Sequence, residues 1–232
     1  ADPYAWKNVL AMPLAGGSAD VSGDLNVNSS TKAVTVTNVT TTKFSHFYGG
    51  SSDFSGNPTA GQSTATDYLT ISSSSDFGWG TGDYTVEMWI YSPTYNGGTN
   101  NNDVVPFSHV ANTGLIYLNW SSGSYGQFKW YNGSSVYTPS PVYNLPPAKW
   151  VHLVVCRSGA TTRLFSNGIL RHSFSDSVNY ATSSIILGKG SGNNLNAFYG
   201  QMSDVRIYKG VAKYTENFVV GSTAPDVLPD TP

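Results

Sequence analysis

Carboxylates are the first residues to weigh for chemistry, because pairs of them hydrolyse glycosidic bonds. A retaining glycosidase needs two carboxyl groups about 5 Å apart, one as nucleophile and one as acid. The chain has two glutamates, Glu87 and Glu216. Glu87 has no second acid two to five residues further on, and no pair of aspartates has the spacing of one strand face. The sequence therefore predicts that the protein is not a hydrolase.

The histidines and the cysteine give no better catalytic candidate. The four histidines are His46, His109, His152 and His172, and none has the His-x-His or His-x-x-x-His spacing of a transition-metal site. The single cysteine, Cys156, lies in an apolar run and is predicted to be a buried structural thiol. No serine elbow offers a nucleophile. We therefore expect a protein that is not an enzyme and has no catalytic residue.

Aromatic residues are the stronger functional signal, because an aromatic face beside an amide or carboxylate is a common way to bind a sugar. Alternation along 127–131 places Phe128 and Trp130 on one face of a strand, and one face of that strand must be core. Each aromatic candidate is therefore either a rim contact or a core residue. The candidate ligand contacts lie in or beside loops rich in Gly, Ser and Asn, and they are Tyr95, Asn101, Asn102, Trp120, Tyr125, Trp130 and Tyr131.

Composition excludes several classes of partner. Only 11% of the 232 residues are charged, against about a quarter in an average domain. The net charge of −2 lacks the basic footprint of a nucleic-acid-binding protein. No basic run would hold a membrane surface, and no apolar run is long enough to span a bilayer. A polar but weakly charged surface is typical of extracellular proteins and of virion parts.

The length fits one all-β domain, which we place at 1–220, followed by an extended tail at 221–232 that contains three prolines. The chain begins Ala-Asp-Pro-Tyr, without the charged and apolar regions of a signal peptide. This start looks like one exposed by removal of an initiator methionine. We therefore expect synthesis in a cytoplasm and release by another route, such as with a virion.

Short β-rich runs separated by turn residues fill most of the chain. The run 84–91 is apolar on both faces, as expected of a central strand. Asn167-Gly168 predicts a two-residue type I′ hairpin turn, and 211–218 is the one stretch expected to be helical. The pattern predicts an all-β fold, a two-sheet antiparallel β-sandwich with jelly-roll connectivity. The other predicted strands are 9–14, 33–37, 44–54, 68–71, 104–110, 114–120, 127–131, 136–137, 150–157, 162–166, 169–172, 184–187 and 198–208.

Four of these segments resemble one family in order and spacing. GDYTVEMW (82–89), WVHLVVCR (150–157), LFSNGIL (164–170) and GQMSDVRIY (200–208) are similar to core motifs of the laminin-G-like branch of the concanavalin A-like lectin/glucanase superfamily. The glucanases of that superfamily share a Glu-x-Asp-x-x-Glu strand, which Glu87 does not complete. The resemblance implies a concanavalin A-like, LamG-like sandwich without catalytic activity.

The resemblance also implies roles for single residues. His152, Trp89 and Trp150 lie in the motif strands, where packed core or sheet positions are expected. Ser203 replaces the first acid of the closing motif, and Asp204 keeps the second, where we expect a structural acid bonded to backbone or to an arginine.

Relatives in this family often bind Ca²⁺ through aspartate and backbone oxygens of a rim loop, the hard ligands that this ion prefers. The loop at 96–103 offers such oxygens, so Asp103 is a candidate ligand for a structural Ca²⁺. The alternative is a solvated loop that leads into a strand, with no metal or other cofactor.

Shorter matches at 2–10, 68–78 and 211–218 resemble copies of the domain carried by tailed bacteriophages, especially those of marine cyanobacteria. They imply a non-catalytic virion protein, a capsid decoration or a tail or fibre component that binds host-surface glycan. One end of the chain, 1–6 or 221–232, would dock it to other virion proteins. Assembly into a homo-oligomer is also compatible with this role. The alternatives are a bacterial cell-surface or secreted lectin and a purely architectural virion protein without ligand.

Overall fold

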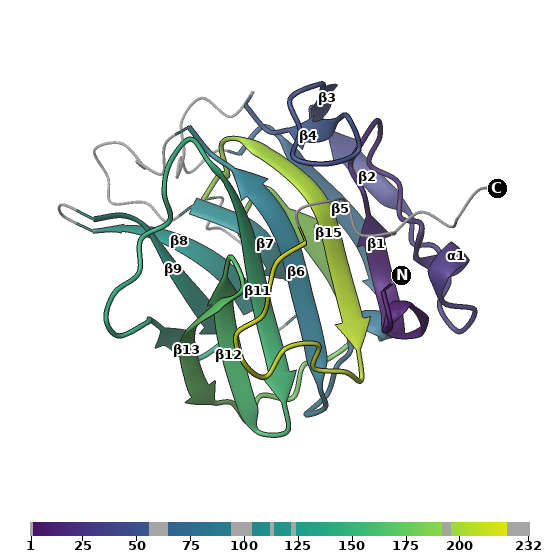
Figure 1. Cartoon of the computed structure of the whole chain (residues 1–232). Helices are drawn as coiled ribbons and strands as arrows, with labels where there is room; N and C mark the ends of the chain where they lie inside the picture. The colour runs from purple at the N-terminus through teal and green to yellow at the C-terminus, as the bar shows by residue number, and fades with distance from the viewer. Residues whose placement is uncertain are drawn as a thin grey trace.

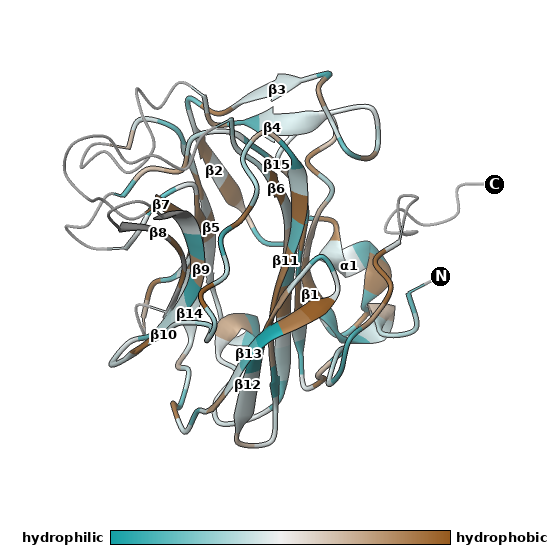
Figure 2. Cartoon of the chain, turned by 60° about the vertical axis from the view of Figure 1, so that its left-hand side comes forward, coloured by the Kyte–Doolittle hydropathy of each residue, from teal (hydrophilic) through white to brown (hydrophobic). Residues whose placement is uncertain are grey.

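The structure, a computed structural model, describes residues 2–55, 65–93, 104–111, 114–121, 124–191 and 196–221. Its strands form two antiparallel sheets that face one another, which confirms the predicted all-β sandwich (Figures 1 and 2). The helical elements are short: η1 (Ala5–Lys7), α1 (Ser22–Leu25) and η2 (Ser75–Phe77).

The first sheet has eight strands and carries the site described below. Its order is β13 (Ile169–Ser175), β12 (Thr161–Ser166), β11 (Trp150–Ser158), β6 (Tyr84–Tyr91), β15 (Gln201–Lys209), β4 (Ser51–Asp53) and β3 (Thr40–Thr42), with β1 (Asn8–Met12) also paired to β15.

The second sheet has seven strands. Its order is β10 (Val136–Tyr137), β9 (Ser124–Asn132), β8 (Gly114–Ser121), β7 (Val104–His109), β14 (Ser183–Leu187), β5 (Tyr68–Ser74) and β2 (Val34–Thr37).

The core lies between the sheets and follows from strand alternation. Along β6 the side chains of Tyr84, Val86, Met88 and Ile90 point inward and are fully buried. The intervening residues point to the outer face of the first sheet. On that outer face most of β6 is nonetheless buried, because another part of the chain covers it.

The covering segment is the C-terminal stretch 210–221, which we call the strap. It crosses the outer face of β6, β11 and β12 (Figure 1). The predicted helix at 211–218 is wrong, because the strap's polar groups bond to the sheet instead of to one another. The Thr85 hydroxyl donates to the Val211 carbonyl (3.0 Å) and accepts from the Lys213 amide (3.0 Å). The Phe218 amide donates to the Gly168 carbonyl (2.9 Å).

The structure confirms some predictions made from local sequence and corrects others. Asn167 and Gly168 have φ of 49° and 75°, so the type I′ turn is confirmed. The strand predicted at 44–54 is reduced to Ser51–Asp53, because Tyr48 and Gly49 have φ of 61° and 68° and break the extended backbone. Cys156 is buried, as expected.

Gly168 couples the hairpin turn to the strap. A Cβ at this position would lie 2.0 Å from the carbonyl oxygen of Phe218. We predict that Gly168→Ala lowers the free energy of unfolding by about 1–2 kcal/mol for the left-handed backbone and by about 1–3 kcal/mol more for the overlap. Gly159→Ala is the matched control, since Gly159 has φ of +58° but nothing within 4 Å of the added Cβ. Urea denaturation compares the two variants, and equal losses would contradict the contact.

Candidate functional site

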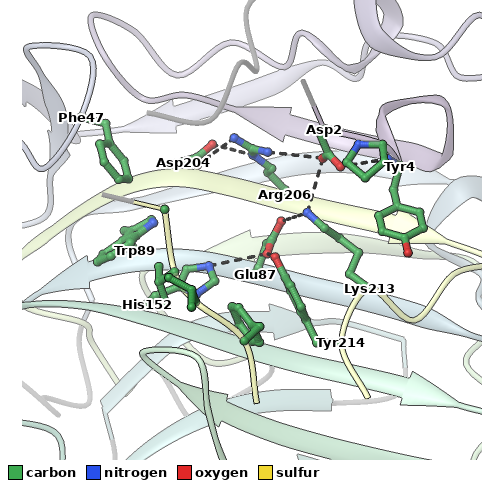
Figure 3. Close-up of a pocket in the computed structure, with 15 residues that line it drawn as sticks. Asp2, Tyr4, Phe47, Glu87, Trp89, His152, Asp204, Arg206, Lys213 and Tyr214 are labelled. Atoms are coloured by element: carbon green, nitrogen blue, oxygen red, sulfur yellow. Dashed lines mark hydrogen bonds and ion pairs between the residues drawn. The ribbon is translucent and has the colours of Figure 1, made fainter. Parts of the chain in front are cut away.

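A pocket of about 330 Å³ lies on the outer face of the first sheet (Figure 3). Its walls come from residues 2–4, from Phe47, from outward-facing side chains of β6, β11 and β15, and from the strap. Segments from both ends of the sequence therefore meet over the central strands.

Strand pairing positions the residues of the pocket floor. In the pairing of β6 with β11, His152 lies opposite Trp89. In the pairing of β6 with β15, Arg206 lies opposite Glu87, after a bulge between Ser203 and Arg206.

The bulge has its own backbone anchor. Asp204 adopts a left-handed φ of 52°, which aspartate tolerates better than most residues, and its amide donates to the Pro13 carbonyl (3.1 Å). The bulge thus brings an acid and a base of β15 to the outer face beside Glu87.

Glu87 is a buried carboxylate that is bonded at both oxygens. Lys213 Nζ donates to Oε1 (2.6 Å) and the Tyr214 hydroxyl donates to Oε2 (2.9 Å). His152 Nε2 lies 3.6 Å from Oε2. Two of these three partners come from the strap, so the strap neutralises the acid that β6 places there.

Arg206 forms the second half of the same network. It donates from Nε (2.7 Å) and Nη2 (2.9 Å) to the two oxygens of Asp204, and from Nη1 to Asp2 (3.5 Å). Lys213 Nζ also reaches Asp2 (3.4 Å), and the Tyr208 hydroxyl donates to the same carboxylate. No acid or base in these ion pairs is more than 8% exposed. Asp204 is therefore the arginine-bonded structural acid that its motif implies.

The network fixes the protonation of its members. Burial raises the pKa of Glu87, but Lys213, His152 and Arg206 outweigh burial and hold that pKa well below its usual value. Burial and the Glu87 charge raise the pKa of Tyr214. Burial raises the pKa of Asp204, and the charge and hydrogen bonds of Arg206 oppose that shift. Glu87 is thus a carboxylate and Tyr214 a phenol at neutral pH.

Aromatic rings form the other wall of the pocket. The Trp89 ring lies 5.3 Å from that of Phe47 and 5.1 Å from that of His152, between ring centroids. Phe218 closes this side from the strap, 6.0 Å from His152 and edge-on to it. His152 is only 6% exposed, and its Nδ1 has no hydrogen-bond partner among the described residues.

None of the predicted ligand contacts that the structure describes lines this pocket. Tyr95, Asn101, Asn102 and the metal candidate Asp103 lie outside the described residues. Trp120 lies in β8 and Tyr125 in β9, on the second sheet, where the structure describes the strands but not these two side chains.

Two further candidates on β9 are described. Tyr131 is half-buried, and its hydroxyl donates to the Gly133 carbonyl (2.9 Å). The prediction that Trp130 contacts a ligand is wrong. Trp130 has no exposed surface, and its indole nitrogen donates to the Tyr180 hydroxyl (3.3 Å) in the core. Since Phe128 and Trp130 share the inner face, the alternation along this strand identified the core face and not a ligand contact.

Sequence reasoning missed the pocket because its members are far apart in the chain. Asp2, Glu87, Asp204 and Lys213 come from four segments, and no local motif links them. The available signal was Glu87 itself, a charge in an otherwise apolar central strand, which must find partners when it is buried. His152, predicted to be only a packed sheet residue, is buried but also contacts this carboxylate.

Two further classes of site are not found within the described ranges. Across residues 2–221, apart from the gaps given above, no three His, Cys, Asp or Glu side chains form a group that could hold a metal ion. In the same part of the chain, no helix has the length and apolar character to cross a membrane.

The two-sheet sandwich, with its motif strands β6, β11, β12 and β15 adjacent or paired in one sheet, defines a lectin-like β-sandwich protein. The sequence model of Laminin_G_3, described as the concanavalin A-like lectin/glucanases superfamily, matches residues 63–216. The chain belongs to this family. A search of curated protein sequences found no match.

Solved structures with this fold include domains of extracellular enzymes and toxins. Domain 4 of AbnA, a GH43 arabinanase of Geobacillus stearothermophilus solved in complex with arabinotriose, aligns with a TM-score of 0.59 and 17% identity over 89% of this chain and 94% of that domain. The binding domain of Paraclostridial Mosquitocidal Protein 1 aligns with a TM-score of 0.63 and 16% identity over 90% of this chain. A botulinum neurotoxin serotype D binding domain aligns with a TM-score of 0.60 and 15% identity over 91% of this chain. The chain spans about half the length of these two toxin domains, and the likeness concerns the fold.

The depressed pKa of Glu87 predicts how stability depends on pH. A carboxylate whose pKa is lower in the folded than in the unfolded state stabilises the fold above its unfolded pKa of about 4.3 and loses that contribution as the pH falls further. We expect Glu87→Gln to lower the free energy of unfolding at pH 7 by about 3 kcal/mol, the lower end for breaking a buried pair, because Asp2 still faces Lys213.

Urea denaturation between pH 3 and 7 tests this difference. The gap between the parent and Glu87→Gln should shrink as the pH falls below about 4.3. Glu216→Gln is the control, because Glu216 is exposed and its substitution should change stability by less than about 0.5 kcal/mol at every pH. A gap for Glu87→Gln that stays constant with pH would show that the buried charge is not what stabilises the strap.

Proposed function

We propose that the chain is a non-catalytic glycan-binding module and that its binding site is the pocket on the outer face of the first sheet. The observation that carries this proposal is the pocket's construction, an aromatic wall that faces a buried polar network. A ring face suits the apolar face of a sugar, and fixed polar groups suit its hydroxyls. A volume of about 330 Å³ lies within the usual range of ligand sites, which begins at about 300 Å³.

The carboxylates of the pocket support a binding function without catalysis. Glycoside hydrolysis needs one carboxylate free to attack or to activate water, and one carboxylic acid free to donate a proton. Glu87 and Asp204 each use both oxygens in bonds to the protein's own cations and hydroxyls. The fold also occurs in a toxin binding domain and in domain 4 of an arabinanase, which was solved in complex with arabinotriose.

We propose further that the module belongs to a phage particle, as a capsid decoration or a tail or fibre component on the virion surface. The supporting observation is the resemblance of 2–10, 68–78 and 211–218 to domains of tailed phages. Two of these segments build the site, since residue 2 and the strap meet over Glu87. Residues 2–6 are tied to the body through Asp2, while the neighbouring Trp6 is 60% exposed and available to another virion protein.

The pocket is tested by removing its aromatic wall. We expect Trp89→Ala to weaken glycan binding by at least about thirtyfold, the effect of losing a central aromatic contact. A glycan array followed by calorimetry on the best ligand measures this, with arabinotriose included as a probe. Trp6→Ala is the matched control, because Trp6 is exposed and does not line the pocket. Thermal melting of both variants separates lost binding from lost folding.

Two results would contradict the pocket proposal. Unchanged affinity in a folded Trp89→Ala protein would place the glycan elsewhere. The absence of any glycan ligand would leave an architectural role.

The location is tested by fractionation. In lysates of the host in which the protein is made, we expect it to sediment with intact particles in a density gradient and to keep a fixed copy number per particle through repeated purification. Quantitative mass spectrometry of the gradient fractions measures this ratio. Recovery only in the cell envelope or the free protein fraction would favour the bacterial lectin instead.

A further inference from the structure

A second aromatic surface lies beside the pocket. It consists of Phe44, His46, Tyr91 and Trp150, which we call the shelf. Tyr91 and Trp150 are a cross-strand pair on the outer face of β6 and β11, and their ring centroids are 5.8 Å apart. Phe44 stacks on Trp150 (5.7 Å, 21° between planes) and meets Tyr91 edge-on (4.6 Å).

The shelf faces solvent although it is built of rings. Phe44 is 46% exposed, His46 is exposed, and Tyr91 and Trp150 are half-buried. Scattered apolar residues on a surface need no explanation, but four adjacent rings form a continuous patch that points to a ligand. Hydrogen bonds also hold the Phe44 backbone: its amide donates to the Thr42 hydroxyl and its carbonyl accepts from the Ser51 hydroxyl.

The shelf is continuous with the pocket. The His46 ring lies 4.0 Å from Trp89, a pocket wall, and 6.0 Å from Trp150 on the shelf. Along β11, Trp150 and His152 are two residues apart on the same face, so one belongs to the shelf and the other to the pocket. The rings therefore lead from the pocket onto an open surface, which is the shape of a site for an oligosaccharide rather than for one small molecule.

Charge in the pocket selects against an acidic ligand. All three nitrogens of Arg206 donate to protein oxygens, and Lys213 Nζ donates to Glu87, Asp2 and Tyr208. Lys213 thus uses all three of its N–H donors and Arg206 four of its five, so both cations are already paired with acids and hydroxyls of the protein. The three acids of the pocket lie against these two bases and His152, so an anion that enters the pocket finds no unpaired cation. Exposed lysines next to the shelf in sequence, Lys43 and Lys149, are screened by solvent and add little.

One polar group in the pocket wall still needs a partner. Nδ1 of His152 has none among the described residues, and leaving a buried polar nitrogen unbonded costs about 1–3 kcal/mol. This nitrogen is itself buried, so the cost belongs to the fold and the atom offers no contact at the pocket surface.

We infer that the pocket and the shelf form one extended site for a neutral oligosaccharide, whose terminal residue enters the pocket and whose next residues stack on the shelf. This inference rests on the proposed glycan-binding function and adds the length and the charge class of the ligand.

Three comparisons test it on the full chain by calorimetry. Arabinotriose, maltotriose and cellotriose are each compared with their monosaccharide, and at least one trisaccharide should bind more tightly. Phe44→Ala and Trp150→Ala should weaken that trisaccharide about threefold to tenfold, the range for one aromatic contact, and leave the monosaccharide unchanged. Lactose should bind at least as tightly as 3′-sialyllactose, which adds only an acidic residue. Trp6→Ala is the control for loss of an exposed ring away from the shelf.

The outcomes separate this inference from the function on which it rests. Trisaccharide binding that is lost in Trp89→Ala but unchanged in folded Phe44→Ala and Trp150→Ala overturns the shelf and leaves the pocket. Preference for 3′-sialyllactose overturns the neutral class. If the parent binds no sugar in this set or on a glycan array, the proposed function fails, and the inference fails with it.

Discussion

The structure depends on one constraint: a carboxylate on the central strand of a sheet is buried and must be paired. Glu87 lies on the outer face of β6, with β11 on one side and β15 on the other. A carboxylate buried there without partners would take up a proton instead of keeping its charge, so its partners are what allow Glu87 to stay ionised. Lys213 and Tyr214 are those partners, and they lie on the strap. Glu87 therefore helps to hold the strap on the outer face of the sheet, together with the apolar packing of Tyr214 and Phe218 on Phe165.

The pairing also links the two ends of the described chain. Lys213 bonds to Asp2 as well as to Glu87, and Arg206 joins Asp2 to the bulge at Asp204. Each of these charges would be destabilising alone, and the network stabilises them only when all the segments are present. The pocket is the space left where these segments meet over the sheet. The pocket therefore results from the same pairing. Its walls include residues 2–4 and the strap, which lie far apart in the sequence.

The sequence predicted the scaffold better than the site, for a physical reason. Strand alternation and the Asn167-Gly168 turn are local properties, so the two sheets and the hairpin followed from them. Residues 211–218 of the strap were predicted to be a short helix. Their bonds to Thr85 and Gly168 are tertiary contacts, which the local sequence does not reveal. Trp130 was a candidate ligand contact because alternation along 127–131 separates the two faces of the strand but does not say which face is buried. Contacts between residues 2, 87 and 213 follow only from the assembled sheet.

The same network decides what kind of recognition the site can perform. Charges that are paired with one another hold the pocket's shape, and each cation in it already faces an acid of the protein. Under the proposed function, specificity would come from the ring faces of Trp89 and of the shelf. Rings and single hydrogen-bonding groups discriminate by shape and hydroxyl placement, not by charge.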